Sequence, residues 1–73
     1  MNNRYIHPVG SIISVGDDNE RVWKNVKILV LRYQRERCYY QFLGEQVVDL
    51  GSYNKVYWMN VDWEGYKRAK LIS

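Results

Sequence analysis

Residues 26–61 read VKILVLRYQRERCYYQFLGEQVVDLGSYNKVYWMNV, and this stretch decides the fold. Apolar and aromatic side chains alternate with polar ones along most of it, which is the period of a β-strand rather than of a helix. Residues that favour turns interrupt the alternation, above all Gly44 and the run Gly51–Asn54. The stretch therefore predicts antiparallel strands joined by short turns.

Turn length sets the register between these strands. A two-residue turn at Arg35-Glu36 pairs Leu31 with Tyr40, and a three-residue loop at residues 44–46 pairs Tyr40 with Leu50. Both turns keep one continuous apolar face. We expect the core on this face, made of Leu29, Leu31, Tyr33, Tyr40, Phe42, Val48, Leu50, Tyr57, Met59 and Val61.

The whole chain predicts an all-β fold, either a small SH3-like barrel or a strongly bent antiparallel sheet of five to six short strands. No window has the apolar spacing and caps of a helix. The opening GSIISV at residues 10–15, the long polar loop after it, and a meander followed by a short last strand resemble SH3-like barrels, which include KOW and Tudor domains. This resemblance implies a fold and no site residue. The expected strands lie near residues 9–15, 26–33, 37–43, 46–50, 55–62 and 67–72.

Length and composition limit the function. The 73 residues predict a single small β domain over residues 1–73, with residues 1–8 as a possible flexible N-terminal arm. Eleven Lys and Arg against eight Asp and Glu give a net charge of +3, which permits an anionic partner without requiring one. Cys38 and His7 are each the only residue of their type, so a disulfide within the chain and a zinc site of Cys and His are excluded.

Catalytic signatures are missing from the sequence. Neither of the glycine-rich phosphate-binding patterns occurs. The acidic pairs Asp17-Asp18 and Asp62/Glu64 lie in polar, turn-like sequence. Water there stabilises the charged carboxylate, so we do not expect the raised pKa that an acid catalyst needs. We therefore expect no enzyme, no cofactor and no metal. The sequence has no secretory signal and no apolar run long enough for a membrane span, so we expect a cytoplasmic protein without a membrane partner.

The second face of the predicted meander is the first candidate site. Exposed apolar patches usually mark interaction sites, and one end of this face predicts such a patch at Ile28, Leu43, Val47, Val56 and Trp58. The alternative is that a curled sheet buries this end in its own core. We expect a non-enzymatic protein-interaction module, a small accessory or phage-type regulator or inhibitor, whose partner is another protein or a second copy of the chain.

A basic hairpin is the second candidate site. Arg32, Arg35 and Arg37 cluster around one predicted turn, and Tyr39 lies opposite Arg32. Arginine beside an exposed ring is how single-stranded nucleic acid is held. The alternative function is therefore binding of single-stranded nucleic acid or of a nucleotide. The competing interpretation is a solvated turn that protects a strand edge, and Glu36 dilutes the positive charge.

Aromatic residues near the ends of the predicted strands form a third group. Trp23, Tyr53, Trp63 and Tyr66 would make a cage for a cation if their rings converged. The alternative is a small hydrophobic core, and the sequence alone leaves both open.

Overall fold

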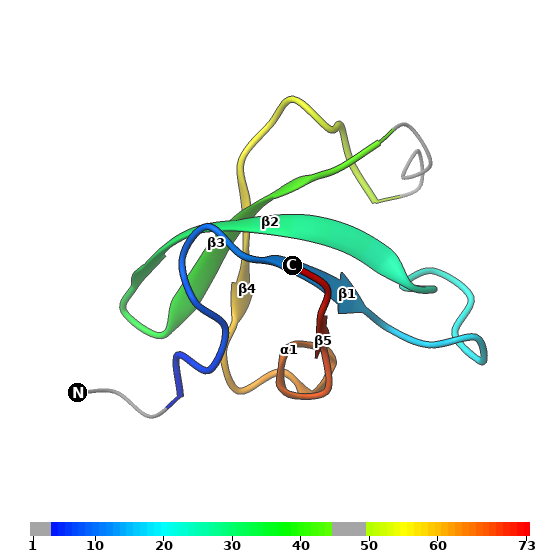
Figure 1. The fold of residues 1–73 in the computed structure, drawn as a ribbon, viewed down its shortest axis with the longest axis horizontal. Coiled ribbons are helices and arrows are strands. Elements are labelled where there is room, and N and C mark those ends of the chain that lie inside the picture. Colours follow the sequence, from blue (N-terminus) through cyan, green and yellow to red (C-terminus); the bar gives the residue numbers. More distant parts are fainter. Residues whose placement is uncertain (1–3, 45–49) are drawn as a thin grey trace.

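One antiparallel sheet of five strands dominates the structure, a computed structural model that describes residues 4–44 and 50–73 (Figure 1). The strand order is β4-β3-β2-β1-β5, and the predicted all-β class is confirmed. No pairing joins β4 to β5 among the described residues, so the sheet is not closed. The elements are β1 (Ile12–Val15), β2 (Val26–Gln34), β3 (Arg37–Phe42), β4 (Tyr57–Asn60), α1 (Glu64–Lys67) and β5 (Lys70–Leu71).

The hairpin of β2 and β3 has the predicted turn but not the predicted register. Arg35 and Glu36 have φ angles of 50° and 65°, as a two-residue hairpin turn requires. The register then shifts between Val30 and Arg32, so that Val30 instead of Leu31 lies opposite Tyr40. The predicted pairing of Leu31 with Tyr40 is wrong because this bulge adds one residue to β2.

The bulge exchanges the two faces of β2 over its first half, since one extra residue inverts the alternation. Ile28 and Val30 are fully buried, whereas Leu29 and Leu31 are only partly buried. The prediction that Leu29 and Leu31 belong to the core is therefore wrong. The buried core consists of Ile13, Val15, Val26, Ile28, Val30, Cys38, Tyr40, Phe42, Met59, Val61 and Tyr66.

The second hairpin also differs from the prediction. Tyr40 lies opposite Tyr57 of β4, so the predicted pairing of Tyr40 with Leu50 is wrong. Of the expected strand at residues 46–50, residues 46–49 lie outside the described residues and Leu50 lies in a turn. The prediction assumed that the shortest loop joins paired strands, so it paired β3 with residues 46–50. In the structure β3 pairs instead with β4, which lies further along the chain.

The chain after β4 forms one helical turn, α1, where the sequence predicted no helix. Glu64 in its first turn and Lys67 in its last match the helix dipole. The expected strand at residues 67–72 is reduced to β5, because Lys67 belongs to the helix. In the part of the chain that the structure describes, no helix is long enough to cross a membrane.

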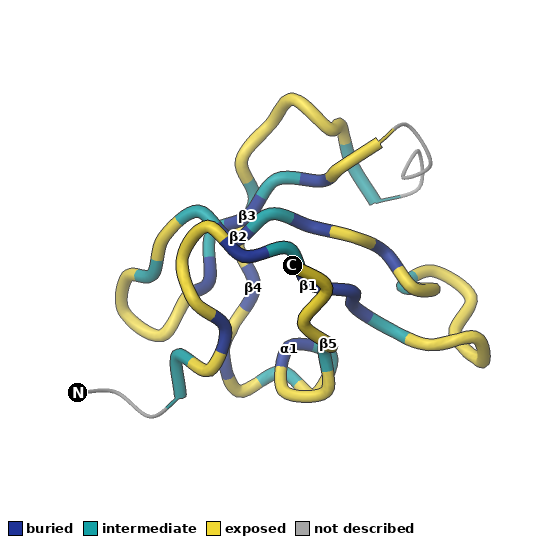
Figure 2. Tube along the Cα trace, viewed as in Figure 1, coloured by how far each residue is buried: buried dark blue, intermediate teal, exposed yellow. Residues whose placement is uncertain are grey.

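Helix α1 and the N-terminal segment close one side of the core. Tyr66 of α1 is fully buried, and its hydroxyl lies 2.6 Å from that of Tyr33. His7 is also buried, and its Nε2 atom lies 2.9 Å from the carbonyl oxygen of Tyr66. The ring of Tyr5 stacks on Tyr33 with centroids 4.3 Å apart. Residues 4–8 of the expected arm thus lie against the folded sheet, and buried residues recur in the central strands and α1 (Figure 2).

Candidate functional site

The structure separates the residues predicted to form the protein interface. Ile28 lies in the core because the bulge turns it inward, so it does not share a surface with the others. Leu43, Val56 and Trp58 are exposed by 40%, 52% and 49%. Val47 lies outside the described residues. An exposed group of three therefore remains from the predicted patch.

The outward face of β2, β3 and β4 brings the basic hairpin and Trp58 together. Side chains alternate along β3, so Arg37 and Tyr39 point outward while Cys38 and Tyr40 point inward. Arg32 lies opposite Tyr39 on one side, and Trp58 lies opposite Tyr39 on the other. We call the four residues Arg32, Tyr39, Trp58 and Arg37 the arginine–aromatic ladder.

Each arginine of the ladder lies over a ring. The Cζ atom of Arg32 is 4.1 Å from the centroid of Tyr39, and that of Arg37 is 4.1 Å from the centroid of Trp58. Such contacts contribute about 0.5–1 kcal/mol each at exposed sites. Arg32 also donates a hydrogen bond to Oε1 of Gln34 at 3.1 Å. These contacts hold both guanidinium groups on the outward face.

The sequence predicted three of the four ladder residues as one group and did not place Trp58 beside them. It placed Arg32, Arg37 and Tyr39 correctly around one hairpin, with Tyr39 opposite Arg32. Trp58 was assigned to the apolar patch, because the sequence did not reveal that β4 pairs directly with β3. Arg35 lies in the turn itself and is exposed.

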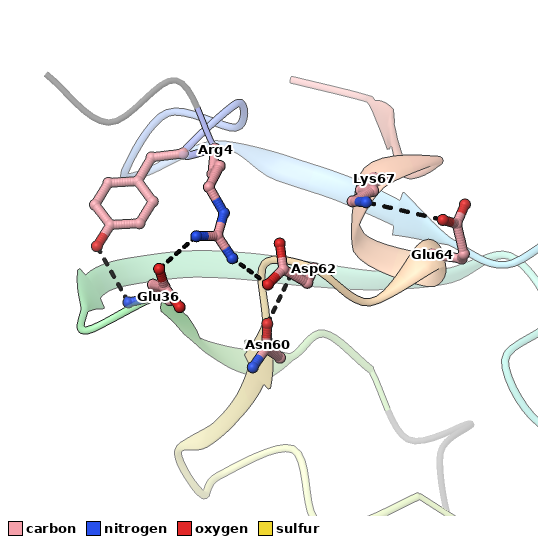
Figure 3. A network of polar contacts seen from close by, with 7 residues as sticks. Arg4, Glu36, Asn60, Asp62, Glu64 and Lys67 are labelled. Carbon is pink, nitrogen blue, oxygen red and sulfur yellow. Dashed lines mark hydrogen bonds and ion pairs between the residues drawn. The ribbon is translucent and has the colours of Figure 1, made fainter.

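The acidic residue of the hairpin turn faces a cation outside the ladder. Glu36 binds Arg4, and the same guanidinium binds Asp62 (Figure 3). The hydrogen bond with Asp62 and the charges of both carboxylates hold the pKa of Arg4 above its ordinary value. The backbone N–H of Glu36 also donates to the hydroxyl of Tyr5 at 3.3 Å. Glu36 is thereby tied to the N-terminal segment.

Cys38 lies on the inner face of β3 and is fully buried. Burial is the main reason that its pKa is raised to about 11. The thiol therefore stays protonated at neutral pH, and a protonated thiol is a poor nucleophile. Cys38 acts as a small apolar residue of the core.

A pocket of about 290 Å³ lies between the loop after β1 and helix α1. It is lined by Gly16, Asp17, Glu20, Glu64, Gly65, Arg68 and Lys70. Three acidic and two basic side chains line it together, so their charges nearly cancel. No group of three potential metal ligands occurs within the described ranges.

The aromatic residues near the strand ends divide between two clusters. Trp23 packs edge-on against Trp63 with centroids 5.2 Å apart and also contacts Phe42 of the core at 5.8 Å. Tyr66 belongs to the separate cluster with His7, and Tyr53 is exposed. The four rings therefore do not converge on one cage.

The loop that carries Trp23 depends on Gly16. Its φ angle is +85°, and a Cβ atom there would lie 1.4 Å from the carbonyl oxygen of Trp23. A residue with a side chain would therefore both strain the backbone and displace this loop.

Searches against models of protein families, curated proteins and solved structures find no match to the chain.

Proposed function

We propose that the chain is a non-catalytic interaction module that binds another protein strand at the outer edge of β4. The partner that fits this edge most simply is β4 of a second copy. The observation that carries the proposal is a strand at the end of the sheet order that has an exposed tryptophan and no charged residue.

The backbone of Trp58 is oriented for such pairing. The N–H of Val61 donates to the carbonyl of Glu36 at 2.9 Å, which sets the phase of the ladder between β3 and β4. Hydrogen-bonded and non-hydrogen-bonded pairs alternate in an antiparallel ladder, so Met59 bonds to β3 and Trp58 does not. The N–H and C=O groups of Trp58 therefore point toward the outer edge. Asn60 ends this edge, because its carbonyl accepts from Trp63 at 3.0 Å.

The side chains of β4 leave the edge unprotected. Proteins usually guard an edge strand with lysine, proline or an inward-pointing charge, and the sequence YWMN of Tyr57–Asn60 contains none of these. Val56, just before the strand, is 52% exposed and Trp58 is 49% exposed. Exposed apolar side chains beside an unguarded edge favour strand addition from a partner.

A second copy satisfies the geometry with one two-fold axis. If the axis passes beside Trp58, the N–H of each Trp58 donates to the carbonyl of its partner. The two rings then lie side by side on the outward face of a continuous sheet. Such an interface is self-complementary, as closed dimers require, and tryptophan is a common energetic anchor.

Light scattering coupled to size exclusion tests the proposal, and a dimer is the expected result. Trp58→Ala should weaken the dimer by upwards of ~2 kcal/mol and leave a folded monomer. Tyr53→Ala is the control, because Tyr53 is also a half-exposed ring, at 56%. A wild-type monomer at every accessible concentration, or equal effects of the two variants, contradicts the proposal.

Variants at two equally exposed valines distinguish strand pairing at the edge of β4 from nonspecific hydrophobic association. Val56 and Val22 are both 52% exposed, but only Val56 adjoins β4. Val56→Lys should weaken the dimer because lysine guards a strand edge, whereas Val22→Lys should not. Equal dimerisation of both variants would show that the edge of β4 is not the interface.

We also propose that the sheet is a partly open SH3-like barrel. The first strand lies between the second and the last in the order β4-β3-β2-β1-β5, β2 is bulged, and one helical turn links β4 to β5. These features support the assignment, and an experimental structure would test whether the two edges approach each other. Cytoplasmic localisation and a role as a small accessory or phage-type regulator or inhibitor stay predictions.

A further inference from the structure

The arginine–aromatic ladder presents two kinds of stacking surface on one open face. Arg32 and Arg37 are exposed, and each guanidinium carbon lies 4.1 Å from the centroid of the ring beneath it. Unpaired bases stack on aromatic rings and on guanidinium planes alike. The rings hold the arginines in place before a ligand arrives, which lowers the entropy lost on binding.

Within the described part of the chain, carboxylates do not cancel the positive charge of this face. Among residues 4–44 and 50–73, no ion pair involves Arg32, Arg35 or Arg37. The hydrogen-bond acceptor of Arg32 is the neutral amide of Gln34. The nearest acid in sequence, Glu36, binds Arg4 instead (Figure 3). A phosphate group at the ladder would therefore meet unpaired positive charge, the main source of affinity for nucleic acid.

The layout of the ladder favours a strand over a single nucleotide. Arg32, Tyr39 and Trp58 occupy adjacent positions on β2, β3 and β4, and neighbouring strands lie about 4.8 Å apart. An extended single strand that crosses the sheet would meet these three side chains in turn. Arg32, Arg37 and Trp58 are exposed on this face, and none of them lines the pocket near α1. A single nucleotide can make only one of these weak stacking contacts, whereas a strand makes several at once and therefore binds more tightly.

We infer that the outward face of β2–β4 binds single-stranded nucleic acid. Arg32 and Arg37 hold phosphates and stack on bases, Tyr39 and Trp58 support them, and Arg35 adds charge at the turn. The site depends on side chains of the sheet face. The dimer proposed above uses the edge of β4 and shares Trp58 with this site, so Arg32 and Tyr39 test nucleic-acid binding separately and Val56 tests the dimer separately.

Fluorescence anisotropy with a labelled single-stranded oligothymidine at low salt is the test. The double variant Arg32→Gln/Arg37→Gln should lose at least ~10-fold in affinity, and its log–log salt dependence should be shallower by about 1.4, for two phosphate contacts. The control is Arg21→Gln/Arg68→Gln, which removes the same charge from two exposed arginines elsewhere. The control should lose less than ~3-fold.

Two further measurements test the stacking. Tyr39→Leu keeps the charge of the face and should lose ~5-fold or more in affinity. Oligonucleotide should quench the tryptophan fluorescence of the wild type, and Trp58→Leu should abolish that quenching although Trp23 and Trp63 remain. Quenching that persists in Trp58→Leu contradicts the assigned site. Circular dichroism checks that each variant is folded.

Three results would overturn the inference. The first is no binding by the wild type at low salt, which would leave this face to a protein partner. The second is equal loss in the ladder and control double variants, which would indicate general charge attraction. The third is equal affinity for a duplex of the same length, whose bases are not available for stacking. If Arg32→Gln/Arg37→Gln loses oligonucleotide affinity but still forms the dimer, the two arginines act in nucleic-acid binding and not in dimerisation.

Discussion

The inward and outward faces of β3 and β4 use the same backbone but have different chemistry. Inward, Tyr40, Phe42 and Met59 are exposed by 5%, 2% and 6% and fill the core. Outward, Tyr39 and Trp58 carry rings of similar size, and Trp58 is 49% exposed. Burial explains the inward rings, because each contributes to the hydrophobic core. The outward rings are less buried, so part of their surface is available for a partner.

Replacing one ring on each face should give the largest contrast in stability. Phe42→Ala should lower the free energy of unfolding by about 3–5 kcal/mol because it opens a cavity in the core. At concentrations where the protein is monomeric, Trp58→Ala should lower it by no more than about 1 kcal/mol, since it removes an exposed ring and its cation–π contact. Urea unfolding of the two variants measures both values. Similar losses would mean that both faces belong to the core.

Neighbouring residues of β2 test the bulge. Ile28→Ala should cost about 2–5 kcal/mol, whereas Leu29→Ala should cost less than about 1 kcal/mol because Leu29 is on the outward face. The register without a bulge predicts the opposite order. Thermal unfolding of the two variants distinguishes the two registers, and a larger loss in Leu29→Ala would remove the bulge from this account.

Sequence reasoning succeeded where a structural feature depends on local chemistry. The turn at Arg35-Glu36 and the position of Tyr39 opposite Arg32 follow from a few adjacent residues. It failed at Leu31 because the run Ile28–Leu31 is apolar at every position, so the alternation does not show which of these residues face the core. A single inserted residue then moved Ile28 from the predicted surface to the core.

The candidate site was predictable only in part for the same reason. Its residues on the first hairpin were found, since that turn was assigned correctly. The position of Trp58 beside Tyr39 follows from the pairing of β3 with β4, which the local sequence does not determine. Helix α1 was missed because a single turn is too short to show a helical period, and Tyr66 is fixed by tertiary contacts.

Alkaline pH should lower the stability of the folded protein through Tyr40 on the inward face. Burial first, and then the neighbouring Tyr57, raise the pKa of Tyr40 to about 12. A pKa raised by folding stabilises the protein below the unfolded value near 10, and this contribution is lost as pH rises from about 10 to 12. The melting temperature should therefore fall over this range. The fall should be smaller in Tyr40→Phe, and an equal fall in that variant would exclude Tyr40 as a cause.

Replacement of Arg4 should have the smallest effect, a modest loss of oligonucleotide binding at the outward face. Arg4→Gln leaves Glu36 and Asp62 without their shared cation. The freed carboxylate of Glu36 should weaken oligonucleotide binding by less than the loss of Arg32 and Arg37 does, because it repels phosphate near the turn. Anisotropy at low and moderate salt measures this change, and the difference should shrink with added salt. Tighter binding by Arg4→Gln would contradict the assigned role of Glu36.

Titration of the protein with single-stranded oligothymidine, followed by NMR shifts of the backbone amides, is the most direct test. It shows whether the oligonucleotide binds the outward face of β2–β4 and leaves the core on the inward face unchanged. The largest shifts should fall at Arg32, Arg37, Tyr39 and Trp58, and the shifts in β1 and β5 should be small. Shifts concentrated at residues 67–70, or no shifts at low salt, would contradict the assigned site.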